Sequence, residues 1–365
     1  MNILFAGGGS LGPVTPLIAT ARALTRLEKN LTCAWIGTPT GPEQLLAKEE
    51  GMQFSSLPVV KLPRYPSIKW LTLPFDWLRV RRLAGAELDR LKPDVVVSVG
   101  GFTATPVMIE AVRRGIPCVM HQLDLKPGLS NRRVARICAS VTTSFEYEKP
   151  PFGEWVSDER IASPTRFTRA DLPSRTAAAK HFGLDAKKPV TLIVGGGTGA
   201  QALNEHVART LPSWLKQTQV LHLTGKGKIK DLKDRTGYVV RELLVDDMDQ
   251  AYVLADLAIS RAGFASLAEM TATLMIPTIA IPLPGTEQED NARAFEERGG
   301  LVVVQQSHPR FDDEVLSAAR LLLEDGEARS AMAEAAHAFL PTDDGTALAK
   351  RILKVVANKN KEKKK

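Results

Sequence analysis

Strand-like and helix-like segments alternate along nearly the whole chain, and this alternation limits the fold more than any other feature. The stretch around Ser260–Ala292 is the clearest example. The apolar run DLAIS leads into Arg261-Ala262-Gly263, a helical stretch carries Glu269, and a second apolar run, TIAIPLP, leads into Glu287-Gln288. Such βαβα order predicts a parallel sheet. The polar residues then follow the carboxyl ends of strands, where open α/β sheets bind ligands.

Two series of this kind follow each other. The first contains the apolar runs NILFA, LTCAWIG, QFSSLPV, PDVVVSVGG, IPCVMHQ and SVTTSF, and the second runs from PVTLIVGGG to LVVVQQ. Residues Val156–Ala170 lack periodicity and are interpreted as a linker. We therefore expect an α/β protein with two Rossmann-like parallel-sheet domains, 1–160 and 167–340, facing each other across a cleft. An amphipathic helix at 344–358 and a disordered basic tail at 359–365 complete the expected organisation.

Composition excludes several classes. With 44% hydrophobic and 24% charged residues, the chain is typical of soluble globular proteins. No apolar run reaches about 18 residues, and the N-terminus enters a strand directly, so we expect neither a spanning helix nor a signal peptide. The cysteines Cys33, Cys118 and Cys138 fit no zinc spacing and indicate reduced thiols in the cytoplasm. More than half of the net charge of +7 lies in the last seven residues, so no nucleic-acid footprint remains.

Two glycine loops each join a strand to a helix. Gly7–Gly12 matches G-x-G-x-x-G, the pattern of dinucleotide sites, but no acidic residue closes the next strand, and Pro13 and Pro16 crowd the helix entry. The dinucleotide interpretation is therefore disfavoured. The second loop, Gly195–Gln201, can bring backbone N–H groups and a helix N-terminus to a diphosphate without a metal. The alternative is a tight turn that binds nothing.

The Ser260–Ala292 stretch resembles the donor site of the MurG family, glycosyltransferases that add N-acetylglucosamine to lipid I and so make lipid II in peptidoglycan synthesis. The family's R-S-G turn, helical Glu, and Gln followed by Asn-Ala correspond to Arg261-Ala262-Gly263, Glu269, Gln288 and Asn291-Ala292. The resemblance implies a GT-B fold and inverting transfer from UDP-N-acetylglucosamine to the muramoyl sugar of an undecaprenyl-linked acceptor, without a cofactor.

The resemblance also implies further donor contacts. The family's G-G-S-Q-G-A loop lies at Gly195–Ala200, and Asp247-Met248-Asp249 is interpreted as a helix start with Asp246 or Asp247 as N-cap, not as a metal site. The predicted donor-binding residues are Ser10, Arg166, Gly196, Gly197, Thr198, Gly199, Val245, Glu269 and Gln288. Two alternatives stay open: Arg166 forms an interdomain salt bridge, and Glu269 decorates an exposed helix.

The acceptor side departs from the family. Gly9, Gly12, Gly100 and Gly101 match its glycine loops and are predicted to bind the acceptor or a phosphate, but Pro13 replaces a proposed active-site His. Proline cannot accept the proton of an attacking hydroxyl, so Asp124 and His121 become the candidate catalytic residues. The alternatives are a structural His121, an Asp124 that only hydrogen-bonds the acceptor or caps a turn, a different lipid acceptor, or an inactive UDP-sugar-binding homologue. A sugar-nucleotide epimerase of the same fold is less favoured.

Residues Lys61–Arg82 combine six Lys or Arg with one Asp and several aromatic and aliphatic side chains. Apolar residues beside a basic face are typical of segments that lie on an anionic membrane, and a lipid-linked acceptor requires that location. We therefore expect a peripheral protein on the cytoplasmic face of the cell membrane. The predicted membrane contacts are Lys69, Trp70, Phe75, Trp77, Arg79, Arg81 and Arg82. The alternative is core packing with a solvated basic edge.

Overall fold

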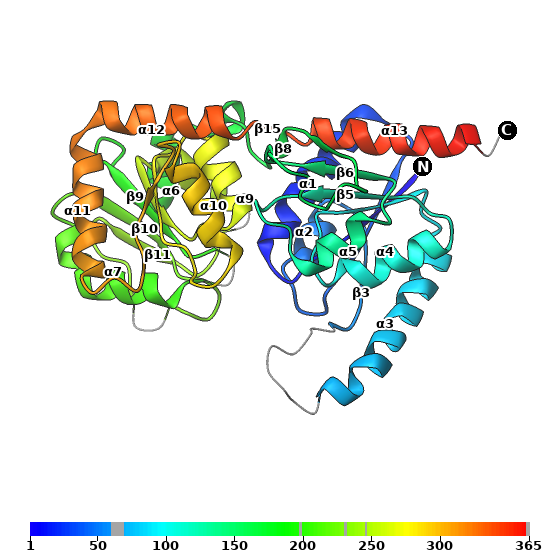
Figure 1. Ribbon diagram of the computed structural model, residues 1–365. Coiled ribbons are helices and arrows are strands. Elements are labelled where there is room, and N and C mark those ends of the chain that lie inside the picture. The colour runs from blue at the N-terminus through cyan, green and yellow to red at the C-terminus, as the bar shows by residue number, and fades with distance from the viewer. Residues whose placement is uncertain (60–68, 197–198, 230–231, 245–246, 363–365) are drawn as a thin grey trace. The chain divides into compact units, whose positions relative to one another are not determined.

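The chain folds as two compact units, described here from a computed structural model that covers residues 1–59, 69–196, 199–229, 232–244 and 247–362. Unit 1 comprises Met1–Arg166 and Asp343–Lys365, and unit 2 comprises Phe167–Thr342. Each contains a parallel sheet with helices packed against it (Figure 1), which confirms the prediction of two Rossmann-like domains.

In the described part of unit 1, the sheet has the strand order β3-β2-β1-β4-β5-β6-β7. The central strands are buried on both faces because helices cover them, which explains runs such as VVVS that do not alternate with polar residues. The strands are β1 Asn2–Ala6, β2 Thr32–Gly37, β3 Gln53–Ser56, β4 Val95–Ser98, β5 Cys118–Gln122, β6 Ser140–Thr143 and β7 Asp158–Arg160. The helices are α1 Leu11–Leu27, α2 Glu43–Glu49, α3 Lys69–Leu91, α4 Ala104–Arg113, α5 Leu129–Ala135 and α13 Thr346–Glu362.

The predicted linker Val156–Ala170 is wrong over its first half. Strand β7 pairs with β6 in parallel at the edge of the sheet, and β8 (Ser163–Pro164) pairs with β15 (Thr342–Asp343). Because an edge strand faces solvent, β7 carries the polar sequence DER, and its strand character is invisible to an apolar pattern. The division between the units follows Arg166.

Helix α13 packs on unit 1 along α1 (Figure 1). A Cβ on Gly345 would lie 2.6 Å from the backbone of Ala19 and Thr20, so a glycine is needed where the chain enters this contact. The expected disordered tail from 359 is wrong in part, because the helix continues to Glu362. Lys359 Nζ donates to the carbonyl of Asp94 at 3.3 Å, and the sequence has no helix-breaking residue there.

Unit 2 repeats the topology of unit 1, with the order β11-β10-β9-β12-β13-β14 in its described part. Its strands are β9 Val190–Val194, β10 Gln219–Leu223, β11 Tyr238–Arg241, β12 Leu257–Ser260, β13 Thr278–Ala280 and β14 Val302–Val303. Its helices are η1 Arg169–Asp171, α6 Arg175–Phe182, α7 Gln201–Trp214, α8 Met248–Leu254, α9 Phe264–Ser266, η2 Leu267–Thr273, α10 Glu287–Glu296, α11 Phe311–Glu324 and α12 Gly326–Phe339.

Helix α3 extends along one side of unit 1, and its N-terminal turns project beyond the sheet (Figure 1). Its C-terminal half packs on α4 through buried residues such as Val80, Ala84 and Leu88. Within the described residues, no helix is both long enough and apolar enough to cross a membrane.

Candidate active site

In each unit the strand order changes direction between the first and fourth strands, so the loops after these two strands flank a ligand-binding position. In unit 2 the two strands are β9 and β12, and the loops are Gly195–Gly199 and Arg261–Gly263. In unit 1 they are β1 and β4, followed by Gly7–Ser10 and Val99–Gly101.

The loop after β9 is built around glycines. Gly199 has φ +68°, and a Cβ there would lie 2.1 Å from the carbonyl oxygen of Thr224 in the next loop. Its N–H donates to the carbonyl of Gly196 at 2.8 Å, which closes a turn before the 14-residue helix α7. An anion at this edge would meet a helix N-terminus. Three predicted donor contacts, Gly197, Thr198 and Val245, lie outside the described residues.

Arg261 joins the loops after β12 and β13. Its Nη1 donates to the carbonyls of Ile281 at 2.9 Å and Pro282 at 3.2 Å. Burial lowers the pKa of the guanidinium from its ordinary value. The Arg261 side chain therefore holds the loops after β12 and β13 together. The sequence pattern indicates only a turn at this position.

Glu269 is a buried carboxylate. Its side chain is 4% exposed, and Tyr252 Oη donates to Oε2 at 2.9 Å. The alternative that Glu269 decorates an exposed helix is therefore wrong. The helix is also irregular: residues Leu267–Thr273 form π-helical turns, a geometry that recurs at functional sites. Sequence periodicity does not reveal this widened turn.

The side chain of Gln288 orders the loop after β13. Its Oε1 accepts the N–H of Leu283 at 3.1 Å, and the backbone N–H of Gln288 donates to Thr286 Oγ1 at 3.4 Å at the start of α10. Thr286 Oγ1 in turn donates to the carbonyl of Leu283 at 2.7 Å. The amide group of Gln288 is thus held in place beside the edge that carries Arg261.

Asp247 is the N-cap residue of α8, in agreement with the predicted helix start, although its side chain makes no capping hydrogen bond. Its carboxylate lies 3.3 Å from His181 Nε2 and within 3.5 Å of Gln250 Nε2. These two partners come from α6 and α8, and the side chain stays 42% exposed. The other N-cap candidate, Asp246, lies outside the described residues.

In unit 1, Gly9 and Ser10 are exposed, and Ser10 is the N-cap of α1, whose first turn contains Gly12 and Pro13. Proline is tolerated there because the first N–H groups of a helix lack intrahelical partners. A Cβ on Gly7 would lie 3.9 Å from the carbonyl of Gly100, so the loops after β1 and β4 adjoin.

Glu43, which no sequence pattern singled out, holds the loop after β1. The side chain is fully buried, Oε1 accepts both the N–H and the hydroxyl of Thr38 at 2.6 Å, and Oε2 accepts the N–H of Gly9 at 3.0 Å. An acidic group therefore does follow β2, but it lies six residues after the strand. The first turn of a short helix gave no sign that its carboxylate faces inward.

Asn131 connects the loop after β4 to the loop after β5. Its Oδ1 accepts the N–H of Gly101 at 3.0 Å, and its Nδ2 donates to Gln122 Oε1 at 2.7 Å. Gln122 Nε2 donates to the carbonyl of Asp124 at 2.7 Å, and Tyr147 Oη donates to the same carbonyl at 3.4 Å. The backbone at the half-buried Asp124 is thus fixed relative to Gly101.

His121 is wrong as a candidate base. The imidazole is fully buried, with Nδ1 2.9 Å from Thr142 Oγ1 and Nε2 3.0 Å from Ser144 Oγ. Burial lowers the pKa of His121 to about 3, so the ring stays neutral. Both nitrogens are used inside unit 1, and a substrate hydroxyl cannot reach them. Of the two candidates, Asp124 remains.

The predicted membrane contacts differ in how exposed their side chains are. Phe75 is 76% exposed, Arg79 and Arg82 are exposed, and Trp77 is half-buried. Arg81 is wrong as a membrane contact, because its guanidinium lies 2.6 Å from the buried carboxylate of Glu110 on α4. It fastens α3 to the unit instead. For Lys69 and Trp70 the structure describes the helical backbone but not the side chains.

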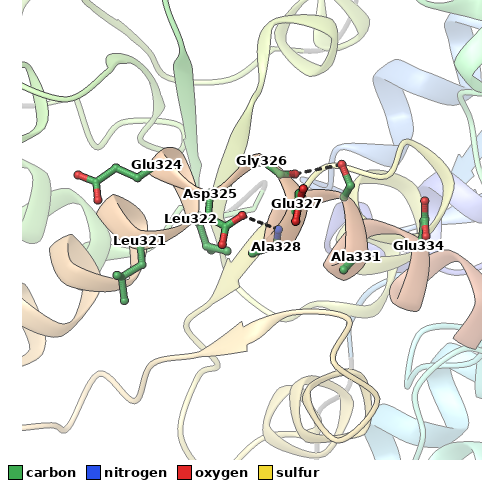
Figure 2. Close-up of a pocket in the computed structure, with 10 residues that line it drawn as sticks. Leu321, Leu322, Glu324, Asp325, Gly326, Glu327, Ala328, Ala331 and Glu334 are labelled. Carbon is green, nitrogen blue, oxygen red and sulfur yellow. Dashed lines mark hydrogen bonds between the residues drawn. The ribbon is translucent and has the colours of Figure 1, made fainter.

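A surface hollow lies at the corner where α11 meets α12 in unit 2, lined by residues that include Leu321, Leu322 and Glu334 (Figure 2). Asp325 caps α12 there by accepting the N–H of Ala328 at 2.9 Å. The adjoining residue Leu323 shares a smaller hollow with Pro189 and Asp256, which precede β9 and β12. The corner is therefore at the amino edge of the sheet, away from the loops described above.

Comparison with known proteins places the two units in one family. Residues 3–143 match the glycosyltransferase family 28 N-terminal domain, and residues 190–345 match the glycosyltransferase family 28 C-terminal domain. The chain belongs to glycosyltransferase family 28. Arg166, at the end of unit 1, lies between the two matched regions of this family pattern, and its predicted donor contact stays a prediction.

Relatives in glycosyltransferase family 28 match nearly the whole chain. A protein of Nocardioides sp. (strain ATCC BAA-499 / JS614) is 38% identical, with 97% of this chain and 98% of that protein covered. A protein of Thermobifida fusca is 34% identical, with 97% and 94% covered. Both are named UDP-N-acetylglucosamine–N-acetylmuramyl-(pentapeptide) pyrophosphoryl-undecaprenol N-acetylglucosamine transferase.

Solved structures agree with the fold. The crystal structure of Acinetobacter baumannii MurG superposes with a TM-score of 0.68 at 26% identity, covering 97% of this chain and 99% of that chain. A UDP-GlcNAc 2-epimerase from Neisseria meningitidis bound to UDP-GlcNAc reaches 0.66 at 13% identity, covering 98% and 100%. The second likeness concerns the fold alone. The predicted GT-B architecture is confirmed.

Proposed function

We propose that this glycosyltransferase moves N-acetylglucosamine from UDP-N-acetylglucosamine to the N-acetylmuramyl sugar of an undecaprenyl-pyrophosphate-linked pentapeptide acceptor, with inversion. The observation that carries the proposal is the buried carboxylate of Glu269, oriented by Tyr252, in the segment that follows β12. Relatives at 33–38% identity, which cover 83% to 97% of this chain, support the choice of donor and acceptor.

The donor nucleotide binds to unit 2 in this proposal. The Gly195–Gly199 loop and the N-terminus of α7 receive the diphosphate, because backbone N–H groups and the helix dipole favour an anion there. Glu269 accepts hydrogen bonds from the ribose hydroxyls, and Gln288 contacts the sugar. As the anomeric carbon is attacked, negative charge grows on the leaving diphosphate, and the same loop stabilises it.

The acceptor binds to unit 1, where Asp124 takes the proton of the attacking hydroxyl. Support comes from its place after β5 and from the network through Gln122 and Asn131 that fixes its backbone. Pro13 cannot take this role, and His121 is inaccessible. A carboxylate at this position replaces the amide that the family has there.

We also propose that α3 lies on the cytoplasmic face of the membrane. The exposed Phe75 and Leu78 precede the exposed Arg79 and Arg82 in α3, so apolar and basic groups share one projecting helix. Such a surface favours anionic lipid. The location suits an acceptor that carries an undecaprenyl chain.

The test is incubation of the purified protein with radiolabelled UDP-N-acetylglucosamine and a short-chain analogue of the lipid-linked acceptor. Label in the lipid fraction, with release of one UDP per sugar, is the expected result. Binding of UDP without transfer would favour an inactive homologue, and conversion of the donor to its C2 epimer would favour an epimerase. Either outcome removes the proposal.

A further inference from the structure

The most completely enclosed carboxylate near a candidate site is that of Glu43. Three donor groups, the N–H and hydroxyl of Thr38 and the N–H of Gly9, bond to it within 3.0 Å. A buried carboxylate is costly unless its oxygens are hydrogen-bonded, and these donors offset that cost. The side chain is therefore part of the construction of the loop, not an accidental contact.

Glycines enclose this carboxylate. A Cβ on Gly8 would lie 2.0 Å from Oε1, one on Gly41 would lie 2.0 Å from Oε2, and one on Gly37 would lie 2.6 Å from Cγ. Three segments of unit 1 thus lack side chains at the positions where Glu43 needs room. The GGGSLG pattern is explained by this enclosure as much as by any ligand.

The glycine loops after β1 and β9 therefore differ in charge, because only the loop after β1 is shown to hold a buried carboxylate. In dinucleotide-binding folds, the N–H groups of the first glycine loop receive a pyrophosphate. Here the N–H of Gly9 is already bonded to an internal anion. A phosphate bound beside that carboxylate would therefore meet electrostatic repulsion.

We propose that Glu43 is a positioning residue that holds Gly9 for a neutral, hydroxyl-bearing part of the acceptor. In this proposal the loop does not bind phosphate, in contrast to the phosphate role predicted for Gly9 from the sequence. The inference rests on the proposed transfer reaction. It specifies that the loop after β1 binds a neutral group that carries hydroxyls. Of the glycine loops after β1 and β9, only the loop after β9 in unit 2 then suits the diphosphate of the donor.

The test uses Glu43→Gln in the full chain. The amide keeps the shape and can still accept from Thr38, but its NH₂ group faces the N–H of Gly9, so this contact is lost. Glu110→Gln is the matched control, because Glu110 is also a buried carboxylate of unit 1, with Arg81 on α3 and Arg114, the C-cap residue of α4, as partners.

The first readout is amide hydrogen exchange, which does not depend on activity. Exchange of the segment 7–12 is expected to rise at least tenfold in Glu43→Gln and to stay unchanged in Glu110→Gln. Added pyrophosphate is expected to leave the segment unprotected in the wild type. Protection by pyrophosphate, or unchanged exchange in Glu43→Gln, would overturn the inference.

The second readout is steady-state transfer, normalised to the number of UDP-binding molecules so that misfolded protein is not counted. Glu43→Gln is expected to lower kcat/KM for the acceptor at least tenfold while the dissociation constant of UDP stays within twofold. Unchanged kcat/KM per UDP-binding molecule, or a parallel loss of UDP affinity, would contradict the inference. If the wild type itself transfers no sugar, the proposed function fails, and the exchange readout still decides the role of Glu43.

Discussion

Tyr252 Oη donates a hydrogen bond to Glu269 Oε2 at 2.9 Å, which joins α8 to the π-helical segment that carries the carboxylate. The ring of Tyr252 packs edge-to-face on Phe167 with centroids 5.8 Å apart, so the hydroxyl is held in place. This pair is the best-defined polar element of the candidate donor site, and it leads to the first prediction.

Removing either member is expected to weaken the binding of UDP. Glu269→Ala loses a charge-assisted hydrogen bond to the ribose, which contributes about 1.5–3 kcal/mol, or roughly tenfold or more in affinity. Tyr252→Phe is expected to cost less, about 1 kcal/mol or roughly fivefold, because it only frees the carboxylate to rotate. Calorimetric titration with UDP measures both.

The control for this prediction is a change of ligand. With 2′,3′-dideoxyuridine diphosphate, which lacks the ribose hydroxyls, both variants are expected to bind like the wild type, because the cycle removes the partner of Glu269. Tyr147→Phe, a hydroxyl deletion in unit 1, should leave UDP affinity unaltered. Equal losses for UDP and the dideoxy analogue would show that Glu269 does not contact the ribose.

Asp124→Asn is expected to lower the turnover number by about 10²–10⁴-fold, the usual contribution of a positioned general base. UDP affinity should stay unchanged, because Asp124 belongs to unit 1. Near-full turnover of this variant across the pH range would exclude Asp124 as the base. The departing diphosphate would then be the remaining acceptor of the proton.

A third prediction concerns pH and stability. Burial lowers the pKa of His121 to about 3 in the folded state, from an ordinary value of 6.5. The unfolded chain therefore binds the extra proton first, and the stability contributed by the neutral ring is full above about pH 6.5 and is lost as pH falls toward 3. The limiting slope is about 1.4 kcal/mol per pH unit.

His121→Asn should lose this pH-dependent component. Its thermal midpoint at pH 7.5 is expected to be lower than that of the wild type, because the hydrogen bonds to Thr142 and Ser144 change. Between pH 7.5 and 5.5, however, its midpoint should fall less steeply than the wild-type midpoint. Parallel curves would mean that His121 is not protonated on unfolding and would contradict its assignment as a buried neutral ring.

Membrane attachment is expected to depend on the exposed part of α3. Replacing Arg79 and Arg82 by Gln removes two charges, worth about 1 kcal/mol each near an anionic surface, so vesicle binding should fall roughly thirtyfold. Cosedimentation with phosphatidylglycerol vesicles at low and high salt measures this. Phe75→Ser should weaken vesicle binding further, and this additional loss should be the same at low and high salt.

Arg81→Gln is the matched control for that experiment. Because Arg81 pairs with Glu110, this variant should lower thermal stability but keep vesicle binding per folded molecule. Removal of residues 363–365 should also keep it. If that removal alone releases the protein from vesicles, the C-terminus is the anchor and the assignment of α3 is wrong.

The strands and the two glycine loops could be predicted because buried parallel strands leave long apolar runs and glycine turns at their ends. Glu269 and Gln288 were predicted as donor contacts in the same way, by their place after β12 and β13. Glu43 could not be found, because an acidic residue in the first turn of a helix is normally solvated. Its inward orientation depends on the space left by Gly8, Gly37 and Gly41. No sequence pattern indicates that these three glycines lie around one side chain.

The errors have similar causes. Arg81 belongs to a basic stretch whose members look alike in sequence, and only the position of Glu110 on another helix separates it from Arg79 and Arg82. Strand β7 is polar because it is an edge, so it was interpreted as linker. In both cases the deciding partner is far away along the chain.

The most direct test of the account is a single measurement of sugar transfer by the wild type and by Glu269→Ala at donor concentrations well below saturation. The account predicts labelled N-acetylglucosamine on the muramyl lipid with the wild type, and a rate at least tenfold lower with Glu269→Ala. Absence of labelled lipid with the wild type, under conditions in which it binds UDP, would contradict the account.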